Sequence, residues 1–325
     1  MSSIKYNKTY INDYFSIAGP LEKKGQIKKF NLTIKDFYYD VDTFEKAEIK
    51  MQRTVIENLL LKNHLAPTKI DYIVGGDLSN QLVITSHALK NYPIPFIGVY
   101  SACATFVESL ILCANLLSTK GVKRCVAITS AHNLVAEKQF RYPVEYGAPK
   151  PLRSTFTATG SVGALVSSDA SNILIESATI GSVVDMGIDD VFHMGAVMAP
   201  AAANTLITHL SEMKRDIDYY DLVLTGDLGE YGTEIFREYL LKIGKIKCKK
   251  HLDAGCELYK GSQNLNAGAS GPATIALVLF NKIINQEKYK KILVIGTGSL
   301  HSPMSINQKN TIPSIAHAVS LEVIK

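Results

Sequence analysis

The chain has 325 residues, of which 46% are hydrophobic and 20% charged, and its formal net charge is +5. This composition is typical of a globular protein with ample apolar material for a core, and the length favours about two domains. The lysine clusters at 23–29 and 245–250 are not interleaved with aromatic residues, so we interpret them as solvated loops, for which an anionic membrane surface is a better partner than nucleic acid.

Residues 1–15 contain no apolar run, so we expect no signal peptide, and no apolar stretch reaches the ~20 residues of a membrane span. The best candidate, at 106–117, is interrupted by a glutamate and an asparagine. Five scattered cysteines fit reduced thiols in the cytosol better than a disulfide framework. Cys248 and Cys256 stand near His251, but three ligands without a fourth, or a CxxC spacing, do not predict a metal site. We therefore expect a cytoplasmic protein without a metal.

The predicted elements recur in the same order in the two halves of the chain. In the first half, a helix at 43–65, a strand at 71–79, a helix at 102–123 and strands at 123–133 and 162–169 follow one another. In the second half, the corresponding segments are 199–215, 221–229, 268–290, 290–301 and 317–324. The strands "DYIVGGDLS" and "DLVLTGDLG" match closely, and both later helices begin with tiny residues. We infer an internal duplication.

Strands that alternate with helices of this length predict a mostly parallel sheet covered by helices. We therefore expect an α/β protein with a five-layer αβαβα arrangement, built from two βαβαβ halves at 1–170 and 171–325. The helices that begin near 102 and 268 form the expected central layer, because tiny residues allow close helix packing. Strand ends and both helix N-termini would then converge on one crevice between the halves, where open α/β sheets tend to bind ligands.

Cys103 stands at the start of the first central helix, where the helix dipole favours a thiolate. A duplicated half with a cysteine at this position resembles the thiolase superfamily. Within that superfamily, the chain is similar to the family of stage V sporulation protein AD from endospore-forming bacteria. The segments that carry this resemblance are "GDLSNQ" (76–81), "SACAT" (101–105), "HNLVAEKQFRYPVEYG" (132–147), "MGAVMAPAAANT" (194–205), "LTGDLGEYG" (224–232) and "TIPSIAHAVSLE" (311–322).

The resemblance implies a protein that binds dipicolinic acid (pyridine-2,6-dicarboxylate) and supports its uptake into the developing spore, with a link to spore germination. It implies partnership with the other SpoVA membrane proteins, a homodimer, and a peripheral position on the spore inner membrane. No cofactor is implied, apart from calcium that accompanies dipicolinate.

The condensing enzymes of the superfamily pair such a cysteine with bases from the second half, and here those positions differ. Leu265 stands near the position of a histidine, Val294 near that of a second cysteine, and Gly226-Asp227 where ketoacyl synthases carry a histidine. We therefore expect a degenerate site that binds a ligand and does not turn it over. Two alternatives stay open, namely an active acyl-CoA condensing or acyl-transfer enzyme that uses Cys103, and a scaffold that acts through protein contacts.

Three histidines, His132, His193 and His301, are candidate substitutes for the missing bases. A hydrogen-bonded loop histidine is the simpler interpretation for each of them. His132 follows the predicted strand at 123–133, and we expect it to face the same crevice as Cys103.

A flat dianion favours backbone amides at a helix start, planar cationic donors and a slot for its ring. The helix start at 102–104 supplies amides, and the segment 137–153 supplies basic residues among aromatic ones, although a dimer-interface loop is the alternative interpretation. For Asp77 and Asp227, which correspond in the repeat, we favour a helix cap or an arginine pair over a direct role. If calcium accompanies the ligand, Asp227 or Glu230 could coordinate it. The candidate ligand-binding residues are Cys103, His132, Arg141, Lys150, Asp227 and Asn266.

Overall fold

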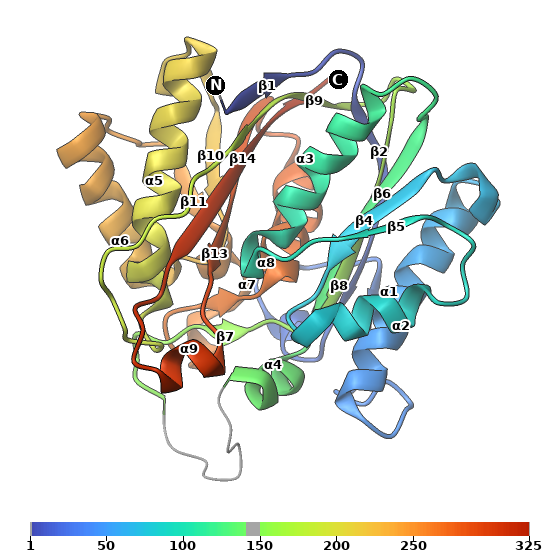
Figure 1. Ribbon diagram of the computed structural model, residues 1–325, viewed down its shortest axis with the longest axis horizontal. Helices are drawn as coiled ribbons and strands as arrows, with labels where there is room; N and C mark the ends of the chain where they lie inside the picture. The colour runs from blue at the N-terminus through green and yellow to red at the C-terminus, as the bar shows by residue number, and fades with distance from the viewer. Residues whose placement is uncertain (1, 141–149, 325) are drawn as a thin grey trace.

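Figure 1 shows the computed structural model, which describes residues 2–140 and 150–324. Ten of its strands form a continuous twisted path that divides into two sets of five. The first set, from its edge inward, is β5 (Phe96–Gly98), β4 (Tyr72–Gly76), β6 (Arg124–Ala131), β8 (Gly160–Ser167) and β2 (Tyr10–Ala18). The second set, in the corresponding order, is β11 (His251–Asp253), β10 (Leu222–Thr225), β13 (Lys291–Ser299), β14 (Ser314–Val323) and β9 (Ile173–Ile180).

The two sets share their pairing pattern as well as their order. In each, the first three strands are parallel and the fourth is antiparallel to both of its neighbours. The sets meet where β2 pairs with β9 at Tyr10 and Leu174. The duplication predicted from the sequence is therefore present in the fold.

The sheet is less parallel than the alternation of strands and helices predicts. Both β8 and β14 run against their neighbours, because the chain returns to the same sheet end instead of crossing over. The pairing of Ser299 with Ser314, and of Ala131 with Gly160, marks these returns. An antiparallel partner needs no crossover to the other end of the sheet, and the described parts of the two returns carry one short helix each, α4 (Asn133–Phe140) and α9 (Pro303–Asn307).

Helices form three layers that alternate with the two strand sets (Figure 1). Outside the first set lie α1 (Phe44–Lys62) and α2 (Val83–Leu89), and outside the second lie α5 (Met194–Met213) and α6 (Gly229–Tyr239). Between the sets lie α3 (Thr105–Leu117) and α8 (Pro272–Val278). The expected five-layer arrangement is thus confirmed, with the expected helices in its centre.

The central helices are mostly apolar because protein surrounds α8 and most of α3. Phe106 and Leu110 of α3 are fully buried, and so are all residues of α8. Pro272 opens α8, a position where its missing N–H costs nothing. A helix that is hydrophobic all round belongs in the core of a large protein. Among the residues that the structure describes, no helix combines the length and the apolar composition needed to cross a bilayer.

The remaining short elements gather mainly at the end of the molecule where α3 and α8 begin. They are α4 (Asn133–Phe140), α7 (Ala254–Leu258), α9 (Pro303–Asn307), β1 (Ser3–Lys5), β3 (Leu32–Thr33), β7 (Phe156–Thr157) and β12 (Ala269–Ser270). The parallel pair β7 and β12 joins the two halves directly in front of α8. This pair carries two residues of the site described next.

Candidate functional site

Cys103 lies in a strained turn that directs it toward the junction of the two halves. The turn is a single 3-10 segment, η4 (Ala102–Ala104), and Ala102 has a φ of 51°, which L-residues adopt at a cost of about 1–2 kcal/mol. Strand β13 passes directly behind it, so closely that a Cβ added at Gly298 would lie 2.1 Å from the carbonyl oxygen of Ser101. The second half therefore holds the turn that carries the cysteine of the first half.

The carboxyl group of Asp227 lies beside the Cys103 thiol, and both are buried, with exposed fractions of 1% and 8%. Asp227 Oδ2 accepts the Gly271 N–H at 3.0 Å, and the Asp227 N–H donates to Thr297 Oγ1 at 3.1 Å. Its other oxygen, Oδ1, makes no hydrogen bond of good geometry within the described residues. Two acidic groups thus lie side by side in the protein interior.

Burial opposes ionisation of both groups, and the Cys103 thiol stays protonated at neutral pH. Burial, followed by the neighbouring Asp227, raises the pKa of the Cys103 thiol well above its ordinary value. Burial also raises the pKa of Asp227 well above its usual range, because the hydrogen bond from Cys103 offsets only part of the desolvation. Since the thiolate is the nucleophile, a thiol held in its neutral form is poorly reactive.

The equivalent acid of the first half, Asp77, has a different role. Its Oδ1 accepts the Ser79 N–H at 2.8 Å, and its Oδ2 accepts both the N–H and the hydroxyl of Thr85 at 2.9 and 2.6 Å. Asp77 thus caps the start of α2, which is one of the two roles expected of this acid from the sequence. The repeat preserves the carboxyl group but not its surroundings.

A narrow cavity of about 30 Å³ opens beside Cys103, with room for one or two water molecules. Its lining residues include Thr157, Ser270 and Ser299. A wider groove of about 380 Å³ lies outside, between the loop that follows β4 and the loop that follows β13. Tyr100, Phe140 and His301 line both spaces and form the wall between them.

One of the three histidines considered from the sequence lines this cavity. His301 follows β13, its Nδ1 lies 3.3 Å from Ser299 Oγ, and its ring lies 5.1 Å from that of Phe140. Within the described ranges, no hydrogen bond joins a histidine to Cys103 Sγ. His193 lies outside the cavity, at the start of α5 against the ring of Tyr231.

The structure places His132 away from the Cys103 cavity. Its ring is buried between Phe37 and Phe44. Nε2 donates to the Phe37 carbonyl at 2.8 Å, and Nδ1 accepts the Leu134 N–H at 3.2 Å. Burial lowers the pKa of His132 to about 4, so it is neutral. Both ring nitrogens are occupied by the backbone.

The basic residues predicted for the ligand are described in part. Arg141 lies outside the described residues. Lys150 pairs with Glu137 at 2.6 Å, and its ammonium group lies 5.4 Å from the ring of Phe156. Arg153 pairs with Asp190 at 2.8 Å. The described cations of this segment therefore have carboxylate partners.

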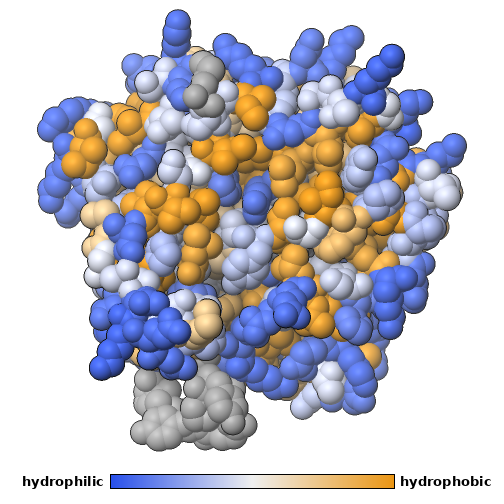
Figure 2. Space-filling view, in the orientation of Figure 1, coloured by the Kyte–Doolittle hydropathy of each residue, from blue (hydrophilic) through white to orange (hydrophobic). Residues whose placement is uncertain are grey.

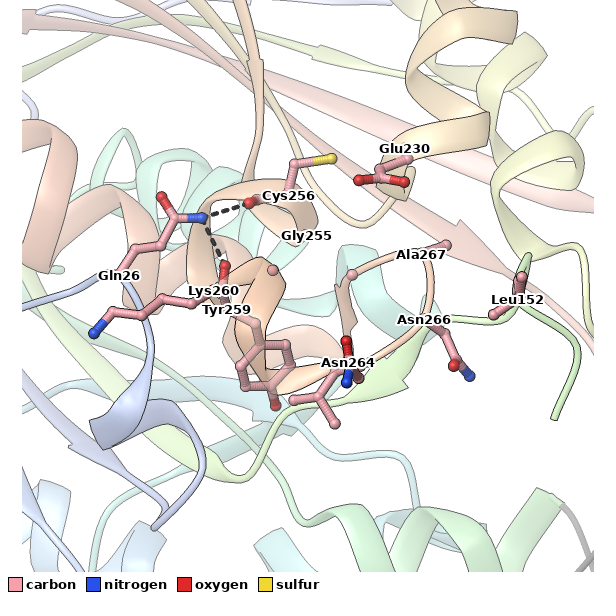
Figure 3. Close-up of a pocket in the computed structure, with 13 residues that line it drawn as sticks. Gln26, Leu152, Glu230, Gly255, Cys256, Tyr259, Lys260, Asn264, Asn266 and Ala267 are labelled. Carbon is pink, nitrogen blue, oxygen red and sulfur yellow. Dashed lines mark hydrogen bonds between the residues drawn. The ribbon is translucent and has the colours of Figure 1, made fainter. Parts of the chain in front are cut away.

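Asn266 lies in a second, larger space of about 470 Å³, shown in Figure 3. Its neighbours there include Gln26, Glu230, Cys256 and Asn264, which enter the space from separate segments. Gln26 Nε2 donates to the carbonyls of Cys256 and Tyr259 at 2.8 and 2.6 Å, as the dashed lines show. Cys103 and Asp227 do not line this space, so the structure separates Asn266 from them.

Four cavity residues were missed as ligand candidates in the sequence, namely Tyr100, Thr157, Gly271 and Ser299. Gly271 has a φ of 103°, a conformation that favours glycine, and a Gly-Pro pair before a helix was the available hint. The other three come from a loop and two strand ends. Tyr100 precedes Cys103 by three residues, whereas Ser299 reaches it only through the placement of the second half against the first.

Comparison with known proteins agrees with this geometry. A family model described as stage V sporulation protein AD matches residues 2–322. Stage V sporulation protein AD of Bacillus subtilis (strain 168) is 40% identical over 317 residues, which cover 96% of this chain and 94% of that protein.

Solved structures with the same fold are thiolase-superfamily condensing enzymes at low sequence identity. OleA of Xanthomonas campestris is 13% identical, with a TM-score of 0.63 and coverage of 98% of this chain and 99% of that one. The 3-oxoacyl-[acyl-carrier-protein] synthase III of Aquifex aeolicus VF5 is also 13% identical, with a TM-score of 0.57 and coverage of 97% and 99%. At this level of identity the likeness establishes the thiolase-like fold alone.

Proposed function

Since the chain belongs to the family of stage V sporulation protein AD, we propose that it binds dipicolinic acid without turning it over and supports its uptake into the developing spore. We further propose that it does so as a homodimer together with the SpoVA membrane proteins. The observation that carries the non-catalytic part is the buried pair of Cys103 and Asp227, in which burial raises both pKa values and keeps the thiol in its unreactive neutral form.

The cavity suits one end of a flat aromatic acid. Residues that carry neutral donors, namely Cys103, Thr157 and Ser270, line the inner space. The inner space admits little more than a carboxylate, so the pyridine ring would lie in the outer groove. There it would contact the aromatic wall of Tyr100 and Phe140, in the offset or edge geometry that rings prefer.

The absence of an unpaired cation among the described lining residues favours the calcium chelate over the bare dianion. Moving an unpaired dianion out of water is costly, whereas a dicarboxylate that chelates Ca²⁺ carries no net charge. Calcium would thus enter with the ligand and not as a resident ion. We expect Ca²⁺ to increase the affinity for dipicolinate.

Isothermal titration with dipicolinic acid, with and without Ca²⁺, tests the proposal. Cys103→Leu fills the inner space and should weaken binding at least tenfold, since it removes a donor and blocks entry. Cys103→Ser keeps a small donor and should bind normally. Asn266→Ala, in the other space, is the matched control and should leave the affinity unchanged. No heat from the parent protein at millimolar ligand, or a loss confined to Asn266→Ala, would contradict this placement.

One observation favours the second candidate, an acyl-transfer enzyme. The strained turn at Ala102 aims the thiol, and the backbone N–H groups of Cys103 and Gly271 face the sulfur. Intact-mass measurement after incubation with several acyl-CoA donors separates the two candidates. We expect an unmodified mass, because the thiol stays protonated. A stable adduct that disappears in Cys103→Ser would establish the enzyme.

A further inference from the structure

The chain between α6 and β11 exposes apolar and basic side chains side by side. It leaves α6 through one π turn, η7 (Leu240–Gly244), reverses at Lys245 with a φ of 54°, and continues to β11. Leu240 is fully buried, whereas Leu241 and Ile243 are 53% and 62% exposed. In Figure 2 an apolar patch lies among hydrophilic residues over this end of α6.

Leu241 and Ile243 are exposed although the segment that carries them is anchored to the core. Ile246 and Cys248, from the same segment, pack against the apolar cluster under α5 and β10. The segment therefore has an inward face that is anchored and an outward face that is free. Leu241 and Ile243 are on the outward face, where two bulky aliphatic side chains gain nothing from water.

The same segment is strongly basic. Lys242, Lys245, Lys247, Lys249 and Lys250 are all exposed, and Lys288 and Lys290 are exposed in the loop before β13. A groove of about 430 Å³, lined by Lys249, Lys250 and Lys288, joins the two stretches. We call these seven lysines, with Leu241 and Ile243, the basic tip.

Few acids neutralise the basic tip. Lys242 lies 3.4 Å from Glu238, in a pair exposed on both sides, and the other six lysines have no salt bridge in the described part of the chain. Asp221 lines the groove, where its Oδ2 accepts the backbone N–H groups of Lys290 and Lys291 at 2.9 Å each and its charge attracts Lys250 and Lys290, so it offsets one of the positive charges. The tip thus presents an excess of positive charge around an apolar centre.

We infer that the basic tip docks the protein on an anionic lipid bilayer, with Leu241 and Ile243 inserted at the headgroup boundary and the lysines on lipid phosphates. Clusters of four to eight basic residues are attracted to anionic membrane surfaces, and exposed aliphatic side chains add insertion. Nucleic acid would use the charge but not the aliphatic pair, since it is bound through phosphates and stacked aromatic rings. The charge and the apolar centre together favour the membrane.

Co-sedimentation of the full chain with vesicles tests this inference. Binding is expected to vesicles of equal parts phosphatidylcholine and phosphatidylglycerol, to fall steeply with added salt, and to be absent with phosphatidylcholine alone. Lys247→Gln with Lys249→Gln should weaken binding about tenfold or more, because each lysine near such a surface contributes about fivefold. Leu241→Ser with Ile243→Ser should weaken binding while leaving the charge unchanged.

The matched control removes the same charge elsewhere. Lys28→Gln with Lys29→Gln alters two exposed lysines of the other cluster and should bind vesicles like the parent. All altered side chains are exposed, so unchanged circular dichroism and thermal melting should accompany every variant. Equal losses in the two lysine pairs, no binding to anionic vesicles, or no effect of the Leu241 and Ile243 substitutions would overturn the inference. An RNA duplex that binds with full affinity to the Leu241→Ser, Ile243→Ser variant and displaces the vesicles would overturn it as well. Dipicolinate titration of the same variants is independent, so a failure here does not touch the proposed ligand.

Discussion

Gly298→Ala should both destabilise the fold and misplace Cys103. A Cβ at this position would lie 2.1 Å from the carbonyl oxygen of Ser101 and 3.4 Å from the Ala104 nitrogen. Neither backbone can move freely. Gly298 is paired with Ile315 inside the sheet, and the Ser101 carbonyl accepts the Ala104 N–H at 3.0 Å to form the turn.

The expected loss follows from this overlap. Carbon and carbonyl oxygen normally stay beyond about 3.3 Å, so the turn or the strand must shift by about 1 Å. Overpacking a rigid core costs about 1–3 kcal/mol, and losing the Ala104 hydrogen bond adds about 1 kcal/mol. We therefore expect the free energy of unfolding to fall by about 2–4 kcal/mol, with a matching loss of dipicolinate affinity.

Urea denaturation measures the free energy, and titration measures the affinity. Gly261→Ala is the control, because a Cβ there meets nothing within 4 Å. It should be neutral or stabilise by about 0.4–1 kcal/mol, since alanine reduces the freedom of the unfolded chain. A loss below about 1 kcal/mol for Gly298→Ala at unchanged urea dependence, or equal losses in both variants, would refute the reasoning.

Three further predictions concern the core and its buried acids. Burial raises the pKa of Glu48 to about 8, so the free energy of unfolding should fall as pH rises from 4.5 toward 8. Glu48→Gln should abolish this fall, and its free energy of unfolding should exceed that of the parent by about 2–4 kcal/mol at pH 8 but by little at pH 5. Urea denaturation at the two pH values measures the difference. Burial alone would raise the pKa of Glu176, but hydrogen bonds from groups such as Lys291 outweigh it and lower the pKa. The ionised Glu176 therefore stabilises the fold above the ordinary pKa of glutamate, and this contribution is lost as pH falls through the lowered pKa. If Glu176→Gln leaves the loss of stability at acid pH unchanged, the prediction is wrong. Leu110→Ala, at a fully buried side chain of α3, should cost about 2–5 kcal/mol, whereas Leu61→Ala, at a side chain 74% exposed, should cost less than about 0.5 kcal/mol by the same measurement.

The layer arrangement could be predicted because it is encoded locally and twice. A strand that ends in Gly-Asp and a helix that begins with tiny residues each occur in both halves, and order alone then identifies the central pair. The direction of β8 and β14 could not be predicted in the same way. Their apolar patterns fit either direction, and only the path of the return segments decides it.

Site residues could be predicted from the sequence where a single strand end or helix start determines their position. Cys103 is such a case, and the equivalence of the two Gly-Asp strand ends brings Asp227 near the same junction. Ser270 and Ser299 reach the cavity through the packing of the second half on the first, which periodicity does not specify. His132 shows the limit of strand-end reasoning, because the Phe37 carbonyl, from a distant loop, captures its ring.

The paired acids Asp77 and Asp227 describe a division of labour. Asp77 accepts three hydrogen bonds at the start of a helix, so its role is structural. Asp227 keeps one oxygen without such a bond and stands next to the thiol. In a duplicated fold, one copy of a residue can thus keep a structural role while the other copy is free to take a different one.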